Sequence, residues 1–167
     1  MKEARRLHSV PSTPNEKPIQ VVIFQIAERK FGIHATKILE IIFHQQILPL
    51  PVPKQLFEGI INLRGHVIPI AHALRRFGLN PRNPIENCSI VIIDILGNEV
   101  GIITDQVDPT LLQVNSHDFE KNEVSYLSED PISGVLINHG EKIEVLDPDR
   151  LLSQEEIREL EKIKESF

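Results

Sequence analysis

The hydrophobic pattern of the chain predicts a series of short strands that begins at Ile19. Ile, Val and Leu gather in short runs, and brief polar joints separate them, as in hairpins. The joints are Glu28-Arg29, Gly97-Asn98 and His139-Gly140. The predicted strands cover residues 19–27, 30–34, 38–43, 59–63, 66–70, 88–96, 99–104, 106–114, 132–138 and 142–147. We therefore expect a mostly β fold.

Helical patterns occur at only two places. Residues 71–77 are compatible with a short helix that ends at Gly78, because glycine suits the left-handed position after a helix. The second helix is predicted at residues 153–166, where Ser153 and Glu156 form a capping-box motif. An apolar stripe at helical spacing follows this motif and should dock on the strands. The stripe consists of Ile157, Leu160 and Ile163.

A weak internal repeat divides the strands into two groups. The segment I-F-Q-I-A-E-R-K-F-G-I at 23–33 corresponds to I-I-D-I-L-G-N-E-V-G-I at 92–102. Similarly, G-I-I-N-L-R-G-H-V-I-P at 59–69 corresponds to G-V-L-I-N-H-G-E-K-I-E at 134–144. About five strands in each group favour closure, because a closed barrel has no exposed edges. The expected fold is two small five-stranded β-barrel subdomains packed together, with a C-terminal α-helix.

The same pattern sets the expected domain boundaries. The first barrel should span roughly residues 30–80 and the second roughly 88–147, within a single domain of residues 19–167. Residues 1–18 show no apolar periodicity and contain several polar residues and prolines, so we expect a disordered tail there.

Composition and charge narrow the possible functions. The 167 residues are 41% hydrophobic, which is enough for a core of their own, and a net charge of -6 argues against a nucleic-acid partner. The single cysteine, Cys88, cannot form an internal disulfide. No apolar run has the length of a membrane span or of a signal peptide. These features predict a cytoplasmic protein without direct membrane insertion.

No catalytic or metal-binding pattern stands out. The seven histidines lack metal-ligand spacing, and no phosphate-binding loop, dinucleotide fingerprint or serine-nucleophile motif is present. We therefore expect no enzyme activity, no metal and no cofactor. We interpret His66 and His72 as structural, and Asp147-Pro148-Asp149 as a turn and cap. Two alternatives stay open: a small enzyme that uses His72 with a neighbouring carboxylate, and a generic peptide-binding barrel.

Three motifs in a fixed order give the chain a family resemblance. They are F-G-I-H-A-T-K-I-L-E-I-I at 31–42, the segment 50–70 that contains N-L-R-G-H-V-I-P, and V-G-I-I-T-D-Q-V at 100–107. Through them, residues 19 to about 160 resemble the CheW-type chemotaxis coupling proteins. The resemblance implies a double five-stranded barrel and a non-enzymatic adaptor. Such an adaptor joins the cytoplasmic tip of methyl-accepting chemoreceptors to the regulatory domain of the histidine kinase CheA, at the receptor array.

The resemblance also implies a receptor-binding site. Arg64 is expected to pair with Glu40 near a receptor-facing groove, and such a pair would explain a charged residue between two apolar runs. The groove is expected to be apolar and to lie at the junction of the two barrels. Its predicted lining residues are Ile38, Ile42, Ile102 and Ile103. One of the last two should be core, because successive strand residues point to opposite faces.

Kinase binding is expected on a separate surface, on the second barrel, because receptor and kinase would compete for a single patch. Gly59 and the strand 134–138, with Gly134 and Val135, mark the two barrel ends that would join kinase domains. An alternative explanation for Gly59 is that its backbone angles require glycine.

One position departs from the family pattern. The family usually carries an aspartate soon after the proline that corresponds to Pro69, whereas this chain carries His72. A side chain that can donate a hydrogen bond replaces an acceptor, so the partner of that aspartate must be satisfied differently. This difference leaves open a divergent paralogue that serves a second chemosensory system or a twitching-type pathway.

Overall fold

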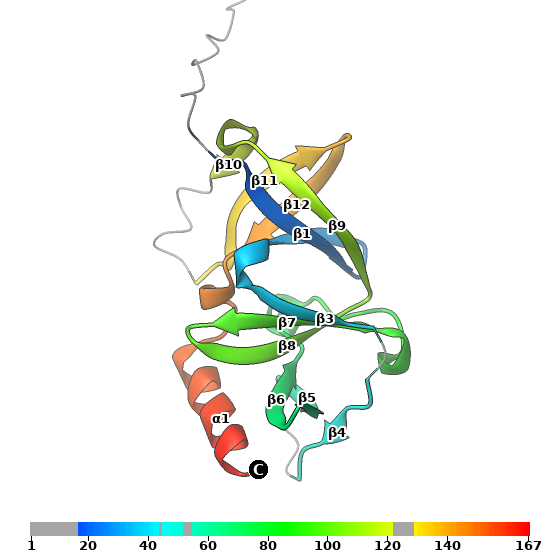
Figure 1. The fold of residues 1–167 in the computed structure, drawn as a ribbon, viewed down its shortest axis with the longest axis vertical. Helices are drawn as coiled ribbons and strands as arrows, with labels where there is room; N and C mark the ends of the chain where they lie inside the picture. Colours follow the sequence, from blue (N-terminus) through cyan, green and yellow to red (C-terminus); the bar gives the residue numbers. More distant parts are fainter. Residues whose placement is uncertain (1–16, 44, 52–54, 122–128) are drawn as a thin grey trace, which may run out of the picture.

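The computed structural model describes residues 17–43, 45–51, 55–121 and 129–167 and shows two packed β-sheets and one C-terminal helix (Figure 1). The predicted mostly β fold with two packed parts is therefore confirmed. Residues 1–16 of the predicted tail lie outside the described residues. No helix in the described ranges is long and apolar enough to cross a membrane.

The first sheet, which we call sheet A, combines strands from both ends of the chain. Its strand order is β10-β11-β12-β2-β1-β9, and all neighbours are antiparallel except β12 and β2. The strands are β1 (Ile19–Ile26), β2 (Arg29–His34), β9 (Gln106–Val114), β10 (Phe119–Lys121), β11 (Ile132–Asn138) and β12 (Glu141–Leu146).

The second sheet, sheet B, uses the middle of the chain. Its strand order is β3-β7-β8-β6-β5-β4, with β6 and β8 parallel and the other neighbours antiparallel. The strands are β3 (Ile38–Ile42), β4 (Leu48–Pro49), β5 (Phe57–Leu63), β6 (His66–Ala71), β7 (Ser89–Ile95) and β8 (Asn98–Thr104).

The two sheets differ from the predicted division of the chain in two ways. Each sheet has six strands rather than five, because the short strands β4 and β10 join the sheet edges. The sheets also do not follow the expected boundaries of 30–80 and 88–147. The hairpin β1–β2 pairs with β9 and β12 from the far end of the chain, so the weak sequence repeat does not correspond to two consecutive halves.

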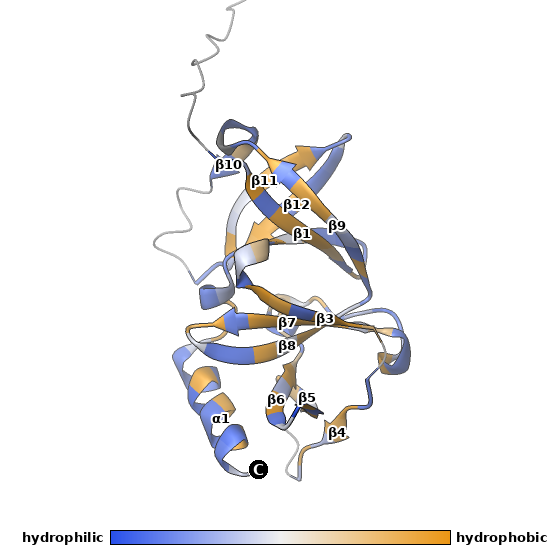
Figure 2. Ribbon diagram, in the orientation of Figure 1, coloured by the Kyte–Doolittle hydropathy of each residue, from blue (hydrophilic) through white to orange (hydrophobic). Residues whose placement is uncertain are grey.

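Three apolar clusters form among the described residues, and apolar residues run along the strands of both sheets (Figure 2). The largest cluster lies between the sheets, because it contains residues of both, such as Phe24 of β1 and Ile102 of β8. Each of the other two clusters is formed mainly by residues of a single sheet. In sheet A, Val114 of β9 and Leu136 of β11 share a cluster although their strands are far apart in the strand order, so sheet A curves around its own core.

Tight hairpin turns connect the strands. Arg64-Gly65, Leu96-Gly97 and His139-Gly140 have positive φ at both residues, as type I′ turns require. The predicted turn at His139-Gly140 is confirmed. The turns predicted at Glu28-Arg29 and Gly97-Asn98 each lie one residue earlier in the chain, at Ala27-Glu28 and Leu96-Gly97. The reason is that Ala27 and Leu96 adopt positive φ, although both are apolar residues that the sequence pattern placed within strands.

The predicted short helix at residues 71–77 is wrong in extent. Strand β6 continues to Ala71, and only Arg75–Phe77 form a 3-10 turn, which ends at Gly78 with φ 77°. Ala71 to Leu74 are all buried, and one face of a surface helix cannot bury four consecutive residues.

The predicted C-terminal helix is present as α1 (Gln154–Glu165). Ser153 and Glu156 form the expected capping box, which satisfies backbone donors at the helix start. Leu160 and Ile163 are buried in the cluster between the sheets, and Ile157 packs against it. The apolar stripe therefore docks α1 on the sheets.

Candidate functional site

Arg64 lies at the tip of the β5–β6 hairpin and forms an ion pair with Glu40 of β3. Its Nη1 donates to Oε2 of Glu40 at 3.0 Å, and its Nη2 donates to Oε1 at 3.1 Å. The Arg64 side chain is 76% exposed and the Glu40 side chain 31% exposed. The predicted pair is confirmed, and it is a surface pair that fixes the direction of the guanidinium group.

An irregularity in β3 sets the direction of Glu40. The pairing of β3 with β7 shifts between Ile38 and Glu40, so Leu39 lies at a β-bulge and is 51% exposed. A bulge changes the face to which the following residues point. Ile38 consequently packs against the cluster between the sheets, whereas Ile42 packs against the cluster of sheet B.

The pair borders a hollow of about 240 Å³ on sheet B. Apolar side chains form part of its surface, and a second polar contact lies within it, with Nδ1 of His66 3.7 Å from Oε2 of Glu99. Sequence reasoning did not single out Leu39 or Glu99, because both lie within ordinary strand patterns. The lining residues are Leu39, Glu40, Leu63, Arg64, His66, Ile68, Ile92 and Glu99.

The predicted exposed groove of four isoleucines is wrong. Ile102 and Ile103 are each 1% exposed, in the cluster between the sheets and in the cluster of sheet B respectively. Both are core because β8 lies in the interior of sheet B with both faces covered. Ile38 and Ile42 are partly buried and face opposite sides, so they do not form one stripe.

The predicted kinase-binding residues lie in different sheets. Gly59 of β5 is buried where a Cβ atom would come within 2.1 Å of the carbonyl oxygen of Leu48. Its φ is not positive, so the close approach of β4 explains this glycine, and a special backbone angle does not. Gly134 and Val135 lie on β11, where a Cβ atom on Gly134 would come within 2.3 Å of the Phe119 ring.

His72, the departure from the family pattern, is buried beside Glu58. Its Nε2 lies 2.8 Å from Oε2 of Glu58, and its backbone N–H donates to the carbonyl oxygen of Leu56. Burial lowers the pKa of His72, the hydrogen bond to Glu58 opposes this shift, and the charge of Arg75 adds to it. The lowered pKa favours the neutral imidazole, whose Nε2 can donate to the Glu58 carboxylate. With 7% of the side chain exposed, it offers little access to a substrate.

Two aspartates have structural roles that the sequence did not reveal. Oδ1 of Asp105 accepts hydrogen bonds from the backbone N–H groups of Arg82 and Asn83, and its Oδ2 accepts one from Ala27, each at 2.7 Å. Asp149 accepts from the backbone N–H of Leu96 and pairs with Lys37. These carboxylates join segments that are distant in the sequence, and no local motif marks such contacts.

Two further observations concern metal binding and the reactivity of the single cysteine. The described residues contain no group of three or more His, Cys, Asp or Glu that could hold a metal ion. Burial raises the pKa of the Cys88 thiol to about 11, and the charges of Asp105 and Glu86 add to this shift. A thiol with such a pKa carries almost no thiolate near neutral pH and is a poor nucleophile.

Comparisons with known proteins agree with this architecture. The family model of the CheW-like domain matches residues 20–156 of this chain. The chain is 29% identical over 158 residues to the chemotaxis protein CheW of Treponema pallidum, which covers 90% of this chain and 92% of the relative. It is 26% identical over 143 residues to the chemotaxis protein CheW of Thermotoga maritima, which covers 86% and 93%.

A solved structure supports the same relationship. The fold is similar to the crystal structure of the scaffolding protein TtCheW from Thermoanaerobacter tengcongensis, with a TM-score of 0.68 and 27% identity. The alignment covers 78% of this chain and 89% of that chain. The chain therefore belongs to the CheW-like domain family. This finding confirms the sequence-based identification as a CheW-type coupling protein.

Proposed function

We propose that this protein is a non-enzymatic scaffold in chemotaxis that couples the cytoplasmic tip of methyl-accepting chemoreceptors to the regulatory domain of the histidine kinase CheA. The match of the CheW-like domain across residues 20–156 is the observation that carries this proposal. The similarity of the fold to a protein described as a scaffold supports it. In this role the protein lies on the cytoplasmic side of the receptor array.

The receptor surface of this proposal is the hollow beside Arg64 and Glu40. Leu39 offers an exposed aliphatic contact, and the Arg64 guanidinium uses only two of its donor groups on Glu40. An amphipathic helix at a receptor tip can place an apolar side chain on Leu39 and an acceptor on the remaining donors of Arg64. Ile102 and Ile103 are core and Ile38 and Ile42 face opposite sides, so the proposed receptor surface does not depend on these four residues.

The kinase surface of this proposal is separate. Gly134 and Val135 belong to sheet A, whereas Arg64 and Glu40 belong to sheet B and its hairpin. The second proposed kinase contact lies at Gly59, where β4 packs closely against β5. Surfaces that share no residues allow receptor and kinase to bind at the same time, which a coupling protein requires.

The test is to titrate a receptor-tip fragment into a preformed complex of this protein with the CheA regulatory domain and to follow complex size by light scattering. We expect a ternary complex. Leu39→Asp should weaken receptor binding at least about tenfold without affecting kinase binding. Leu96→Asp is the matched control, because Leu39 and Leu96 are 51% and 52% exposed. Displacement of the kinase by the receptor fragment would contradict the proposal.

A further inference from the structure

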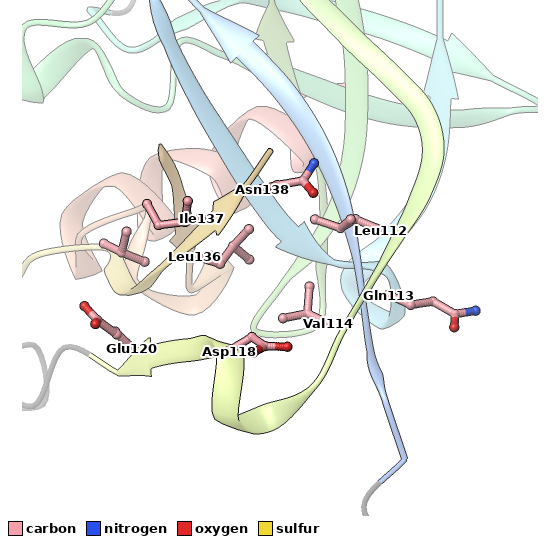
Figure 3. A pocket seen from close by; sticks show the side chains of 9 residues that line it. Leu112, Gln113, Val114, Asp118, Glu120, Leu136, Ile137 and Asn138 are labelled. Carbon is pink, nitrogen blue, oxygen red and sulfur yellow. The ribbon is translucent and has the colours of Figure 1, made fainter. Parts of the chain in front are cut away.

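The strand order of sheet A leaves β9 at one edge and β10 at the other, and a hollow lies between β9 and β11 (Figure 3). In the described part of the chain, β9 pairs only with β1, so its second edge has no strand partner. Strand β10 covers β11 only from Gly134 to Leu136. Ile137 and Asn138 therefore extend beyond β10, and their backbone on that side has no strand partner among the described residues. We call the gap between β9 and β11 the seam.

The seam opens onto the core of sheet A. It contains a hollow of about 350 Å³. Leu112, Val114 and Leu136 line this hollow and also belong to the apolar cluster of sheet A or pack against it. Ile137, at the entrance, is 65% exposed, which is the largest fraction for any large hydrophobic residue in the described ranges. Val114 and Leu136 are themselves buried, so the exposed apolar surface at the seam comes from Ile137 and from the half-buried Leu112.

The charged side chains that line the hollow are acidic. Asp118 and Glu120 line the hollow, and no lysine or arginine lines it. Asp118 accepts a hydrogen bond from Nδ2 of Asn115 and lies 3.5 Å from Nε2 of His117, but both carboxylates remain on exposed residues. These two carboxylates, which we call the rim of the hollow, therefore favour the binding of a positively charged group.

We propose that the seam binds an extended peptide segment of a partner protein that carries alternating aliphatic and basic residues. The segment adds a strand along the free edge of β9, whose unpaired backbone groups supply the hydrogen bonds. Alternate side chains of a strand point to opposite faces, so the aliphatic ones contact Leu112 on the inner face of sheet A, while the alkyl stems of the basic ones pass Ile137 on the outer face. The basic side chains reach Asp118 and Glu120 at the rim.

The N-terminal segment of this chain is the main competing occupant. Ile19 pairs with Val114, so the chain enters β1 beside the seam, and the sequence contains Arg5 and Arg6. However, the residues directly before β1 include Pro11, Pro14 and Pro18, which cannot donate backbone hydrogen bonds to β9. A partner segment without prolines fits the edge better.

The proposal goes beyond the coupling function. The seam shares Val135 with the surface proposed for the kinase, but its binding chemistry is defined by the peptide backbone and by charge. The test uses neither kinase nor receptor, so a negative result leaves the proposed function intact.

The experiment uses the full chain and a fluorescently labelled peptide of about ten alternating valine and lysine residues, with binding followed by anisotropy at low salt. A valine–glutamate peptide and a valine–lysine peptide with N-methylated alternate residues are the controls. We expect the unmodified valine–lysine peptide to bind at least about tenfold more tightly than either control, because it has both the charge and the backbone donors.

Variants locate the binding in the seam. Leu112→Asp and the double variant Asp118→Asn/Glu120→Gln should each weaken binding at least about tenfold. Leu111→Asp controls for the first, because Leu111 is an exposed β9 residue outside the hollow. Glu86→Gln/Glu165→Gln controls for the second, because it removes the same charge from exposed residues elsewhere. Both controls should bind normally.

Several results would overturn the proposal. Equal binding of the three peptides, or no effect of the seam variants, would exclude strand addition there. A gain in peptide affinity on Arg5→Glu/Arg6→Glu would identify the N-terminal segment as the occupant. A change from dimer to monomer on Ile137→Asp, measured by light scattering, would identify a second copy of the chain instead.

Discussion

The guanidinium group of Arg64 holds both carboxylate oxygens of Glu40, although the two residues are 24 positions apart in the chain. Arg64 occupies the first position of a hairpin turn with φ 52°, and its side chain is mostly exposed. An exposed ion pair contributes little to stability. The geometry therefore matters mainly because it presents the guanidinium group in one orientation.

Separate effects on stability and on binding are expected for this pair. Arg64→Asn suits the test, because asparagine tolerates positive φ, and Glu40→Gln keeps the shape of its partner. A double-mutant cycle should give a coupling below ~1 kcal/mol in the free energy of unfolding. Each single variant should weaken binding of a receptor-tip fragment at least about tenfold, measured by calorimetric titration. Strong coupling in stability with unchanged receptor binding would assign the pair a purely structural role.

Gly59→Ala should destabilise the fold through a steric clash. The added methyl group would meet the Leu48 carbonyl oxygen at 2.1 Å and Cγ2 of Ile47 at 2.7 Å, and the backbone atom cannot rotate away. We expect a loss of ~1–3 kcal/mol in the free energy of unfolding, measured with urea. Gly65→Asn is the control, because Gly65 has free space and a positive φ that asparagine tolerates, so its loss should stay below ~1 kcal/mol. Equal losses in both variants would refute the steric explanation.

Asp105→Asn should be costly because the Asp105 carboxylate accepts three backbone hydrogen bonds. An amide presents an NH₂ group to at least one of those backbone donors and leaves it unpaired. The expected loss is ~2 kcal/mol or more in the free energy of unfolding. Asp108→Asn is the matched control, because Oδ1 of Asp108 accepts one backbone hydrogen bond, from Thr110. Thermal melts that shift equally for both variants would contradict a special role for Asp105.

Acid should weaken the fold in part through His72. The unfolded chain protonates this residue near its ordinary pKa of 6.5, whereas burial lowers the pKa in the folded protein. As the pH falls through 6.5, the unfolded state binds the proton first, so the free energy of unfolding decreases. Burial also lowers the pKa of His34, with Asp147 opposing the shift, and this residue acts in the same direction.

The variant His72→Gln isolates this contribution. Glutamine can still donate to Glu58 but does not titrate, so the free energy of unfolding should fall less steeply from about pH 7.5 to about pH 5.5 than in the unmodified protein. Urea unfolding at several pH values measures the difference. Parallel curves for the two proteins would show that His72 titrates alike in the folded and unfolded states.

Most strand positions could be predicted because apolar runs with polar joints are a local property of the sequence. Strands β4 and β10 escaped prediction, because two or three residues carry no periodicity. The bulge at Leu39 also leaves no trace in the composition of β3, yet it decides that Ile38 and Ile42 face opposite sides. For the same reason, the pair of Arg64 and Glu40 could be predicted from the sequence, but the exposed hollow beside it could not.

The burial of Ile102 and Ile103 shows a second limit of local patterns. A strand with alternating apolar and polar residues is covered on one face, whereas β8 packs against apolar clusters on both of its faces. Whether a strand is central or lies at an edge depends on pairings between distant segments, which no short window contains. The contacts of Asp105 and the seam of sheet A depend on the same distant pairings.

The unequal origin of the two sheets has a consequence for synthesis on the ribosome. The β1–β2 hairpin is translated first, but its neighbours β9 and β12 follow only after all of sheet B; the ion pair of Arg29 with Glu144 joins residues 115 positions apart. Sheet B can therefore fold during translation, while the hairpin exposes an apolar face until the chain is nearly finished. The nascent protein is most exposed to chaperones and to misassembly through its earliest strands.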